Sequence, residues 1–180
     1  TYLGFRLFGS DKNKNENGVY QILNTPFSQY GKVDFDYAQS VVIDKNSAFA
    51  WHVGLGVGYP YGNSEILPFE KRYYSGGANS VRGWSVRTLG PGIFAGENNA
   101  MDLMAQSGDI RLDLNLELRS KLFWVVELGA YIDAGNVWTI RNYESQPGGV
   151  FKLNKFYEEI AMSYGLGLRF DFNYFLIRVD

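Results

Sequence analysis

The 180-residue chain contains no cysteine, so neither a disulfide framework nor thiol chemistry is available to it. It also lacks an excess of charge of one sign, because 17 basic residues nearly balance 19 acidic ones. Proteins that bind nucleic acid usually present a basic face, so we expect no nucleic-acid partner. The length is enough for one domain of ordinary size.

Long hydrophobic runs are missing as well. The longest stretch without Asp, Glu, Lys or Arg covers residues 46–64 and contains four glycines, a proline and the only histidine of the chain. It therefore makes a poor transmembrane helix. The first residues of the sequence do not have the pattern expected of a signal peptide. Because Thr1 and Asp180 both fall inside segments with strand character, we expect the chain to be part of a longer protein.

The sequence is instead rich in aromatic residues, at 17%, and in glycine, with 21 residues, while its mean hydropathy of -0.21 is slightly polar. Its main pattern is alternation. Between Asp109 and Arg119, apolar side chains at even positions alternate with polar ones at odd positions. A period of two predicts a β-strand that lies between an apolar and a polar medium.

Similar alternation predicts seven strands, at residues 1–8, 31–44, 48–60, 108–119, 123–139, 159–171 and 175 onward. The complete ones have roughly ten or more residues, whereas soluble strands usually have about five or six. Membrane-spanning strands need about 9–11 residues. We therefore predict an all-β fold, the C-terminal part of an antiparallel transmembrane β-barrel, with a soluble sandwich as the alternative.

The connections between these strands are alternately short and long. Tight turns are predicted at residues 44–47, 120–122 and 172–174, and long connections at about residues 9–30, 61–107 and 140–158. Outer-membrane barrels have short periplasmic turns and long external loops, and an even number of strands, so strands outside this chain must close the barrel. Aromatic residues near the strand ends form interfacial girdles or fill a soluble core; they are Tyr59, Tyr61, Trp124, Trp138, Tyr143, Tyr174 and Phe175.

The most specific motif lies in the longest connection. Residues 81–84 read Val-Arg-Gly-Trp and resemble the Val-Arg-Gly-aromatic motif of the BamA/TamA superfamily, also called bacterial surface antigens. The neighbouring Gly-Gly and Leu-Gly-Pro-Gly stretches are similar to that family's surroundings. The resemblance implies a loop at about residues 61–107 that folds back into the barrel lumen. Its motif residues, apart from the arginine, are Gly76, Gly77, Val81, Gly83 and Trp84.

A second stretch, residues 131–135, resembles the family's aromatic-x-Asp-x-Gly motif, and residues 115–119 resemble the strand before it, which carries an inward Glu. The resemblance implies that Asp133 and Glu117 hold Arg82. Alternation places both acids on the polar face without use of the family. Arginine suits this role because its planar, always-charged fork can contact a carboxylate at two points.

Catalytic and metal-binding interpretations of the same residues are weaker. Glu117 and Asp133 could form a general acid/base pair, but the sequence shows no nucleophile or metal cluster to accompany them. We expect His52 to be a polar residue of the lumen rather than a metal ligand. The acids of the predicted strands are explained by a wet face rather than by calcium; they are Asp34, Asp36, Asp109 and Asp113. The chain is thus expected to have no enzymatic activity, no metal and no cofactor.

The resemblance implies one portion of a barrel domain, residues 1–180, in a bacterial outer membrane. It implies a factor that inserts or assembles client outer-membrane or surface proteins, in contact with outer-membrane lipids and with periplasmic or inner-membrane assembly partners. The family's POTRA domains and closing strand would lie outside these residues. Residues 106–109 and 165–169 look more like the TamA-like branch of Bacteroidetes. The alternatives are a two-partner-secretion transporter or passive porin, and a soluble ligand-binding barrel.

Overall fold

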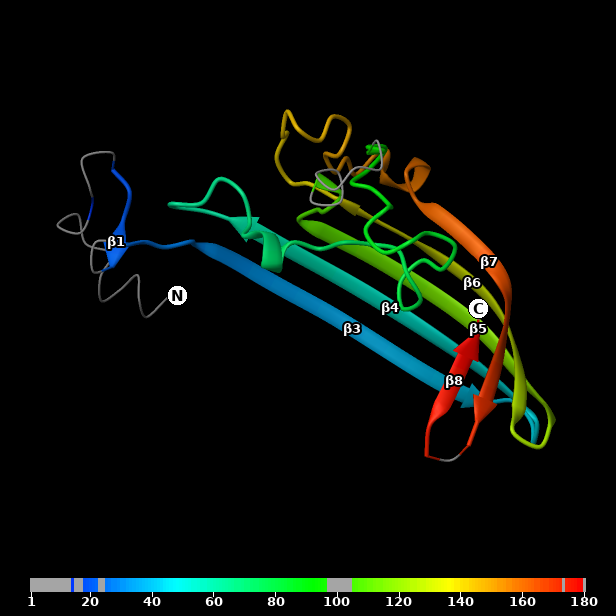
Figure 1. The fold of residues 1–180 in the computed structure, drawn as a ribbon. Helices are drawn as coiled ribbons and strands as arrows, with labels where there is room; N and C mark the ends of the chain where they lie inside the picture. The colour runs from blue at the N-terminus through cyan, green and yellow to red at the C-terminus, as the bar shows by residue number, and fades with distance from the viewer. Residues whose placement is uncertain (1–13, 15–17, 23–24, 97–104, 173, 180) are drawn as a thin grey trace. The chain divides into compact units, whose positions relative to one another are not determined.

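In the computed structural model, which describes residues 14, 18–22, 25–96, 105–172 and 174–179, six strands form one sheet in chain order (Figure 1). The pairs from β4 to β8 are antiparallel, and the order makes each strand the neighbour of the next one along the chain. The strands are β3 (Tyr30–Val42), β4 (Ser47–Pro60), β5 (Ile110–Phe123), β6 (Val126–Trp138), β7 (Ala161–Asp171) and β8 (Leu176–Val179).

The chain forms two compact units. The larger, residues 34–57 and 73–180, contains most of the sheet together with the 3-10 helix η3 (Phe156–Glu158). The smaller, residues 1–33 and 58–72, contains the two-residue strands β1 (Gln21–Ile22) and β2 (Thr25–Pro26) and the 3-10 helix η2 (Phe69–Lys71). Among the described residues, no helix is both long and apolar enough to cross a membrane.

Side-chain amides hold the smaller unit together. The Asn63 side chain donates to the Tyr20 and Phe27 carbonyls, at 2.7 and 3.1 Å, and accepts from the Tyr20 amide at 2.9 Å. Gln29 is 1% exposed, and its side-chain oxygen accepts from the Asn63 amide at 2.9 Å. These bonds join two connections that are distant in the sequence.

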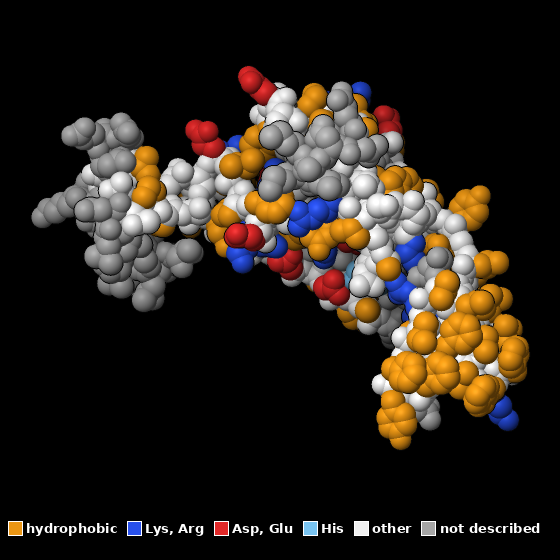
Figure 2. Space-filling model, in the orientation of Figure 1, with side chains coloured by type: hydrophobic (Ala, Val, Ile, Leu, Met, Phe, Trp, Pro, Cys, Tyr) orange, Lys and Arg blue, Asp and Glu red, His pale blue; other side chains and the backbone are white. Residues whose placement is uncertain are grey.

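Burial in the sheet is the reverse of that in a soluble protein. On β5, the side chain of Leu118 is 47% exposed while that of its neighbour Glu117 is 7% exposed. On β6, Ile132 is 50% exposed and Asp133 is fully buried. Figure 2 shows hydrophobic side chains gathered over β8 and the adjacent strand ends. An exposed apolar face opposite a polar one is the pattern of a wall between lipid and an aqueous lumen.

Six of the seven predicted strands coincide with observed ones to within a few residues, and the strand predicted at residues 1–8 lies outside the described residues. The turn predicted at residues 120–122 is wrong. β5 continues to Phe123 across an irregularity after Lys121, and the turn lies at Trp124 and Val125. Pairing extends this far because Lys121 lies opposite Glu127 and Phe123 opposite Val126, one favourable charge pair and one apolar pair.

The predicted aromatic positions separate into two groups. Trp124 and Tyr174 are 80% and 96% exposed, as residues of an interfacial girdle would be. Trp138 is 1% exposed: its ring packs edge-on against Phe151 and Phe156, and its indole nitrogen donates to Glu159 at 2.7 Å. Trp138 therefore belongs to the packing of the connection between β6 and β7.

Candidate functional site

A segment of the longest connection lies on the polar face of the sheet (Figure 1). It begins at Tyr73, whose backbone exchanges hydrogen bonds of 2.9 and 2.8 Å with Gly108, just before β5. Farther along, the Gly92 amide donates to the Val137 carbonyl of β6 at 2.7 Å. We call residues 73–96 the inserted loop. Its backbone is thus bound to the sheet at both ends.

Glycine permits the tight fold of the inserted loop. The amide of Gly77 donates to the carbonyl of Trp84 at 2.8 Å, which closes the segment between them. Gly76 has a φ of +96°, and a Cβ there would lie 2.3 Å from the Ser85 carbonyl oxygen. Only glycine fits such a position. Arg178 of β8 donates to the Ala78 carbonyl at the tip of this fold.

Arg82 projects from this fold into the most buried ion pair of the described residues. Its Nε and Nη2 donate to the two carboxylate oxygens of Asp133, at 2.6 and 2.8 Å, and its backbone amide donates to the same group at 3.1 Å. Nη1 donates to Glu117 at 2.9 Å. Arg82 is 6% exposed and Asp133 is fully buried. Two-point contacts of this kind are among the strongest and most directional hydrogen bonds in proteins.

An aromatic ring supports the guanidinium. The carbon at the centre of the Arg82 guanidinium lies 3.6 Å from the centroid of the Tyr131 ring. Gly165 lies opposite Tyr131 across β6 and β7, and a Cβ there would be 2.5 Å from the Tyr131 hydroxyl. The absence of a side chain at Gly165 leaves room for the ring. The sequence analysis assigned no role to Tyr131, although its place two residues before Asp133 puts it on the same face.

Glu117 binds arginines from two strands as well as from the loop. One oxygen accepts from Arg82, and the other accepts from Arg119 at 2.9 Å and Arg169 at 2.6 Å. Arg169 is 8% exposed and lies on β7. The sequence analysis gave Arg119 and Arg169 no role. Their positions on the polar face were readable from alternation, but their convergence on Glu117 depends on the register between strands.

Electrostatics keep this site charged. Burial alone would lower the pKa of the Arg82 guanidinium, but its hydrogen bonds to Asp133 and Glu117 and the charges of these acids outweigh burial and raise the pKa above its usual value. Arg82 is therefore a permanent cation. A permanent cation in a buried position needs its carboxylate partners at every pH at which the protein functions.

The apolar and polar neighbours of Arg82 complete the site at which the inserted loop binds the sheet, which we call the seat of the loop. Val81 is fully buried, and its side chain lies 3.1 Å from where a Cβ on Gly135 would be. Ser80 donates to Asp113 at 2.6 Å, and its carbonyl accepts from Asn115 at 2.6 Å. Trp84 is half-buried and lines a small hollow with Gly77, Ala78, Arg82, Gly83 and Tyr131.

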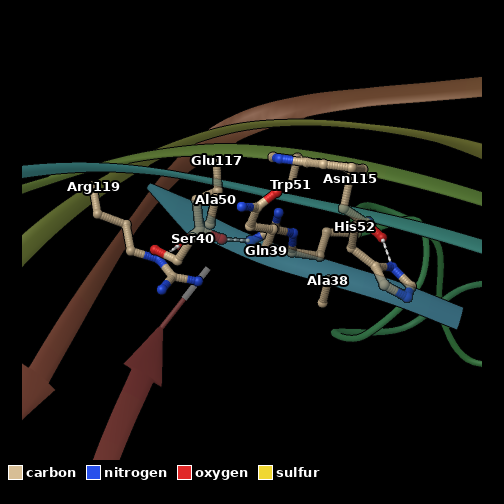
Figure 3. Close-up of a pocket in the computed structure, with 10 residues that line it drawn as sticks. Ala38, Gln39, Ser40, Ala50, Trp51, His52, Asn115, Glu117 and Arg119 are labelled. Atoms are coloured by element: carbon tan, nitrogen blue, oxygen red, sulfur yellow. Dashed lines mark hydrogen bonds and ion pairs between the residues drawn. The ribbon is translucent and has the colours of Figure 1, made fainter. Parts of the chain in front are cut away.

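A cavity of about 350 Å³ lies beside this seat (Figure 3). His52, on its wall, contacts Asn115 at 2.8 Å through Nδ1 and Asp36 at 3.0 Å through Nε2, and so links β3 to β5. Within the described ranges, no group of three or more His, Asp or Glu side chains is arranged to hold a metal ion. The other residues of the wall are Ala38, Gln39, Ser40, Ala50, Trp51, Arg82, Glu117 and Arg119.

An antiparallel sheet of long strands, with an apolar outer face and a loop inserted on its charged inner face, defines a bacterial outer-membrane β-barrel with an occupied lumen. Residues 13–180 match the Omp85 superfamily domain, and the chain belongs to this superfamily.

Three similar proteins give further detail. Over 95 residues, half of this chain, the sequence is 30% identical to the outer membrane protein assembly factor BamA of Neisseria meningitidis serogroup B, and this match covers 12% of that protein. A structure of BamA from Haemophilus ducreyi lacking POTRA domains 1–3 superposes with a TM-score of 0.62 at 20% identity, over 83% of this chain and 30% of that one. CdiB from Acinetobacter baumannii gives 0.48 at 19% identity, over 84% and 22%. The chain thus spans less than a third of the length of each of these proteins.

Proposed function

We propose that the chain is the C-terminal barrel portion of a factor that inserts or assembles client proteins in the outer membrane. The observation that carries the proposal is the buried contact of Arg82 with Asp133 and Glu117, which fixes a loop inside the barrel wall. A transporter with a plugged lumen would also use such a loop, so the test below compares client insertion with ion conductance. The relative from Neisseria meningitidis is named as an assembly factor, which supports the same conclusion.

The three site residues have distinct roles in this proposal. Arg82 is the loop anchor, Asp133 is its two-point partner, and Glu117 extends the contact to β7 through Arg169 while it also binds Arg119 of its own strand. One loop side chain thereby ties β5 and β6 directly and β7 indirectly. We propose that this rigid wall holds its shape while another part of the barrel admits the strands of a client.

The polar character of the anchor matters for this role. Apolar packing would hold the loop without fixing its orientation, because it is not directional. The planar guanidinium of Arg82 instead binds the carboxylate in one orientation. The seat is therefore specific, and the open cavity beside it gives water access to the contacts when the loop moves. Outer-membrane lipids on the apolar face and client proteins at the barrel wall are the partners that this proposal implies.

The test uses the full-length protein in cells that are depleted of the native copy. Arg82→Ala should reduce the insertion of outer-membrane clients while the barrel still folds. Arg87→Ala is the matched control, because Arg87 belongs to the same loop but lies over the Tyr74 ring, 4.6 Å from its centroid. Normal client insertion with Arg82→Ala, together with a rise in ion conductance, would favour the transporter or porin alternative instead.

A further inference from the structure

The inserted loop has a second attachment that is distinct from the Arg82 site. Tyr73, at the start of the loop, is 5% exposed, and its hydroxyl donates to Asp34 of β3 at 2.6 Å. A bond this short to a carboxylate is a strong, charge-assisted one. Packing alone does not require the hydroxyl, since a phenylalanine would fill the same volume.

The ring of Tyr73 occupies a place that the sheet leaves open for it. A Cβ on Gly56 of β4 would lie 2.4 Å from the ring, so any larger residue there would displace it. The guanidinium of Arg111, on β5, lies 5.6 Å from the ring centroid. The backbone of Tyr73 is bound to Gly108 by two hydrogen bonds. The ring and hydroxyl thus contact three neighbouring strands.

The acids that bind Tyr73 and Arg82 lie on different strands. Arg82 binds acids on β5 and β6, and through Glu117 it reaches β7. Tyr73 binds an acid on β3 and lies against a glycine on β4. Burial, first, and the hydrogen bond to Asp34, second, raise the pKa of the Tyr73 phenol, so the hydroxyl remains a donor at every physiological pH.

We infer that Tyr73 is a positioning residue that forms, with Asp34 and Gly56, a second latch of the inserted loop, and that the loop leaves the sheet only when both latches open. The inference deepens the proposed function and rests on it only for the effect on client insertion. It also gives a role to one acid of the polar face of β3, where alternation alone indicated solvent contact. Asp36, two residues along, binds His52 instead.

Two local readouts separate the latches in the full-length protein reconstituted in lipid vesicles without clients. Hydrogen exchange of the Gly108 amide reports on the Tyr73 latch, because this amide donates to the Tyr73 carbonyl at 2.8 Å. Thiol labelling of a Val81→Cys variant reports on the Arg82 latch, because Val81 is fully buried. Residues 1–180 contain no cysteine, and any cysteine elsewhere in the full-length protein is first replaced by serine.

Tyr73→Phe should speed exchange of the Gly108 amide roughly tenfold or more, because it removes a hydrogen bond to a charged group. Asp34→Ala should have the same effect, and the double variant should add nothing to either. Asp34→Asn should have a smaller effect than Asp34→Ala, since its carbonyl still accepts from the phenol but without the charge. Tyr74→Phe is the control, because Tyr74 is 44% exposed.

The combination of Tyr73→Phe with Arg82→Ala should raise labelling of Val81→Cys more than Arg82→Ala alone. Unchanged Gly108 exchange in Tyr73→Phe would overturn the inference, as would equal effects of Tyr73→Phe and Tyr74→Phe. If Tyr73→Phe does not fold, a difference between Asp34→Ala and Asp34→Asn supports the latch and equal behaviour overturns it. These measurements contain no client, so a negative result would contradict the latch but not the proposed role in assembly. A failure of client insertion in cells would contradict the assembly role but not the latch.

Discussion

Asp133 binds both the side chain and the backbone amide of Arg82, with contacts of 2.6, 2.8 and 3.1 Å to one buried carboxylate. The strand therefore fixes the path of the loop backbone as well as the position of the cation. A substitution that keeps the charge but changes the donor geometry should consequently fail to restore the site.

Arg82→Ala should loosen the inserted loop by less than the cost of about 3–5 kcal/mol that breaking a dry buried pair incurs, because water from the adjacent cavity screens the unpaired acid. Arg82→Lys should rescue poorly, since an ammonium lacks the planar fork. The measurement is a double-mutant cycle over Arg82→Ala and Asp133→Ala, read as protease sensitivity of the loop. Strictly additive effects would mean that the two residues do not interact.

Glu117→Gln should destabilise the sheet more than Arg119→Gln does. Glu117 is the shared acceptor of Arg82, Arg119 and Arg169, so its neutralisation leaves three cations close together. Loss of Arg119 removes only one of them and leaves the acid paired. Urea unfolding in lipid vesicles measures both changes, and an equal loss of stability would contradict the role of Glu117 as a shared acceptor.

Leu116→Arg should destabilise the barrel by about 2–4 kcal/mol if the position lies near the bilayer midplane, because the side chain faces lipid. Leu116 is 45% exposed on the apolar face of β5. Ser40→Arg is the comparison, since Ser40 lines the polar cavity, and its cost should be much smaller. Folding titrations in vesicles give both values. Equal penalties would exclude the assignment of the two faces.

The long connections should be external and the short turns periplasmic. A cysteine at Ser145, in the connection between β6 and β7, should react with an impermeant thiol reagent on intact cells. One at Asn46, in the turn between β3 and β4, should react only after the outer membrane is opened. Residues 1–180 contain no native cysteine, so each introduced thiol is the only one in this part of the protein. The reverse labelling pattern would invert the topology.

Alternation in the sequence was sufficient to place strands and faces, because a period of two is a local property. It did not place the end of β5, where the polar residues Ser120 and Lys121 look like a turn but continue the pairing. The resemblance of two motifs to those of the superfamily predicts the contact between Arg82 and Asp133.

Other contacts could not be predicted. Arg169 meets Glu117 through the registers of β5, β6 and β7, and Tyr73 meets Asp34 through the path of the inserted loop. Periodicity within one strand carries no information on these registers. Nothing in the sequence pairs Gly56 with the Tyr73 ring or Gly165 with the Tyr131 ring.

The reversed burial of the sheet has a consequence for how this chain can vary. Tyr164 and Leu166 are 86% and 67% exposed, and on the proposed lipid face they would meet fluid lipid tails, which accommodate almost any apolar shape. Asp133 and Asn115 bind donors and acceptors at fixed positions, so a substitution that exchanges a single donor or acceptor atom breaks a hydrogen bond. In most soluble proteins the buried apolar residues are constrained by close packing, and the exposed polar residues vary. In this sheet the apolar residues need only remain apolar, and the specific fit depends on the charged and amide side chains.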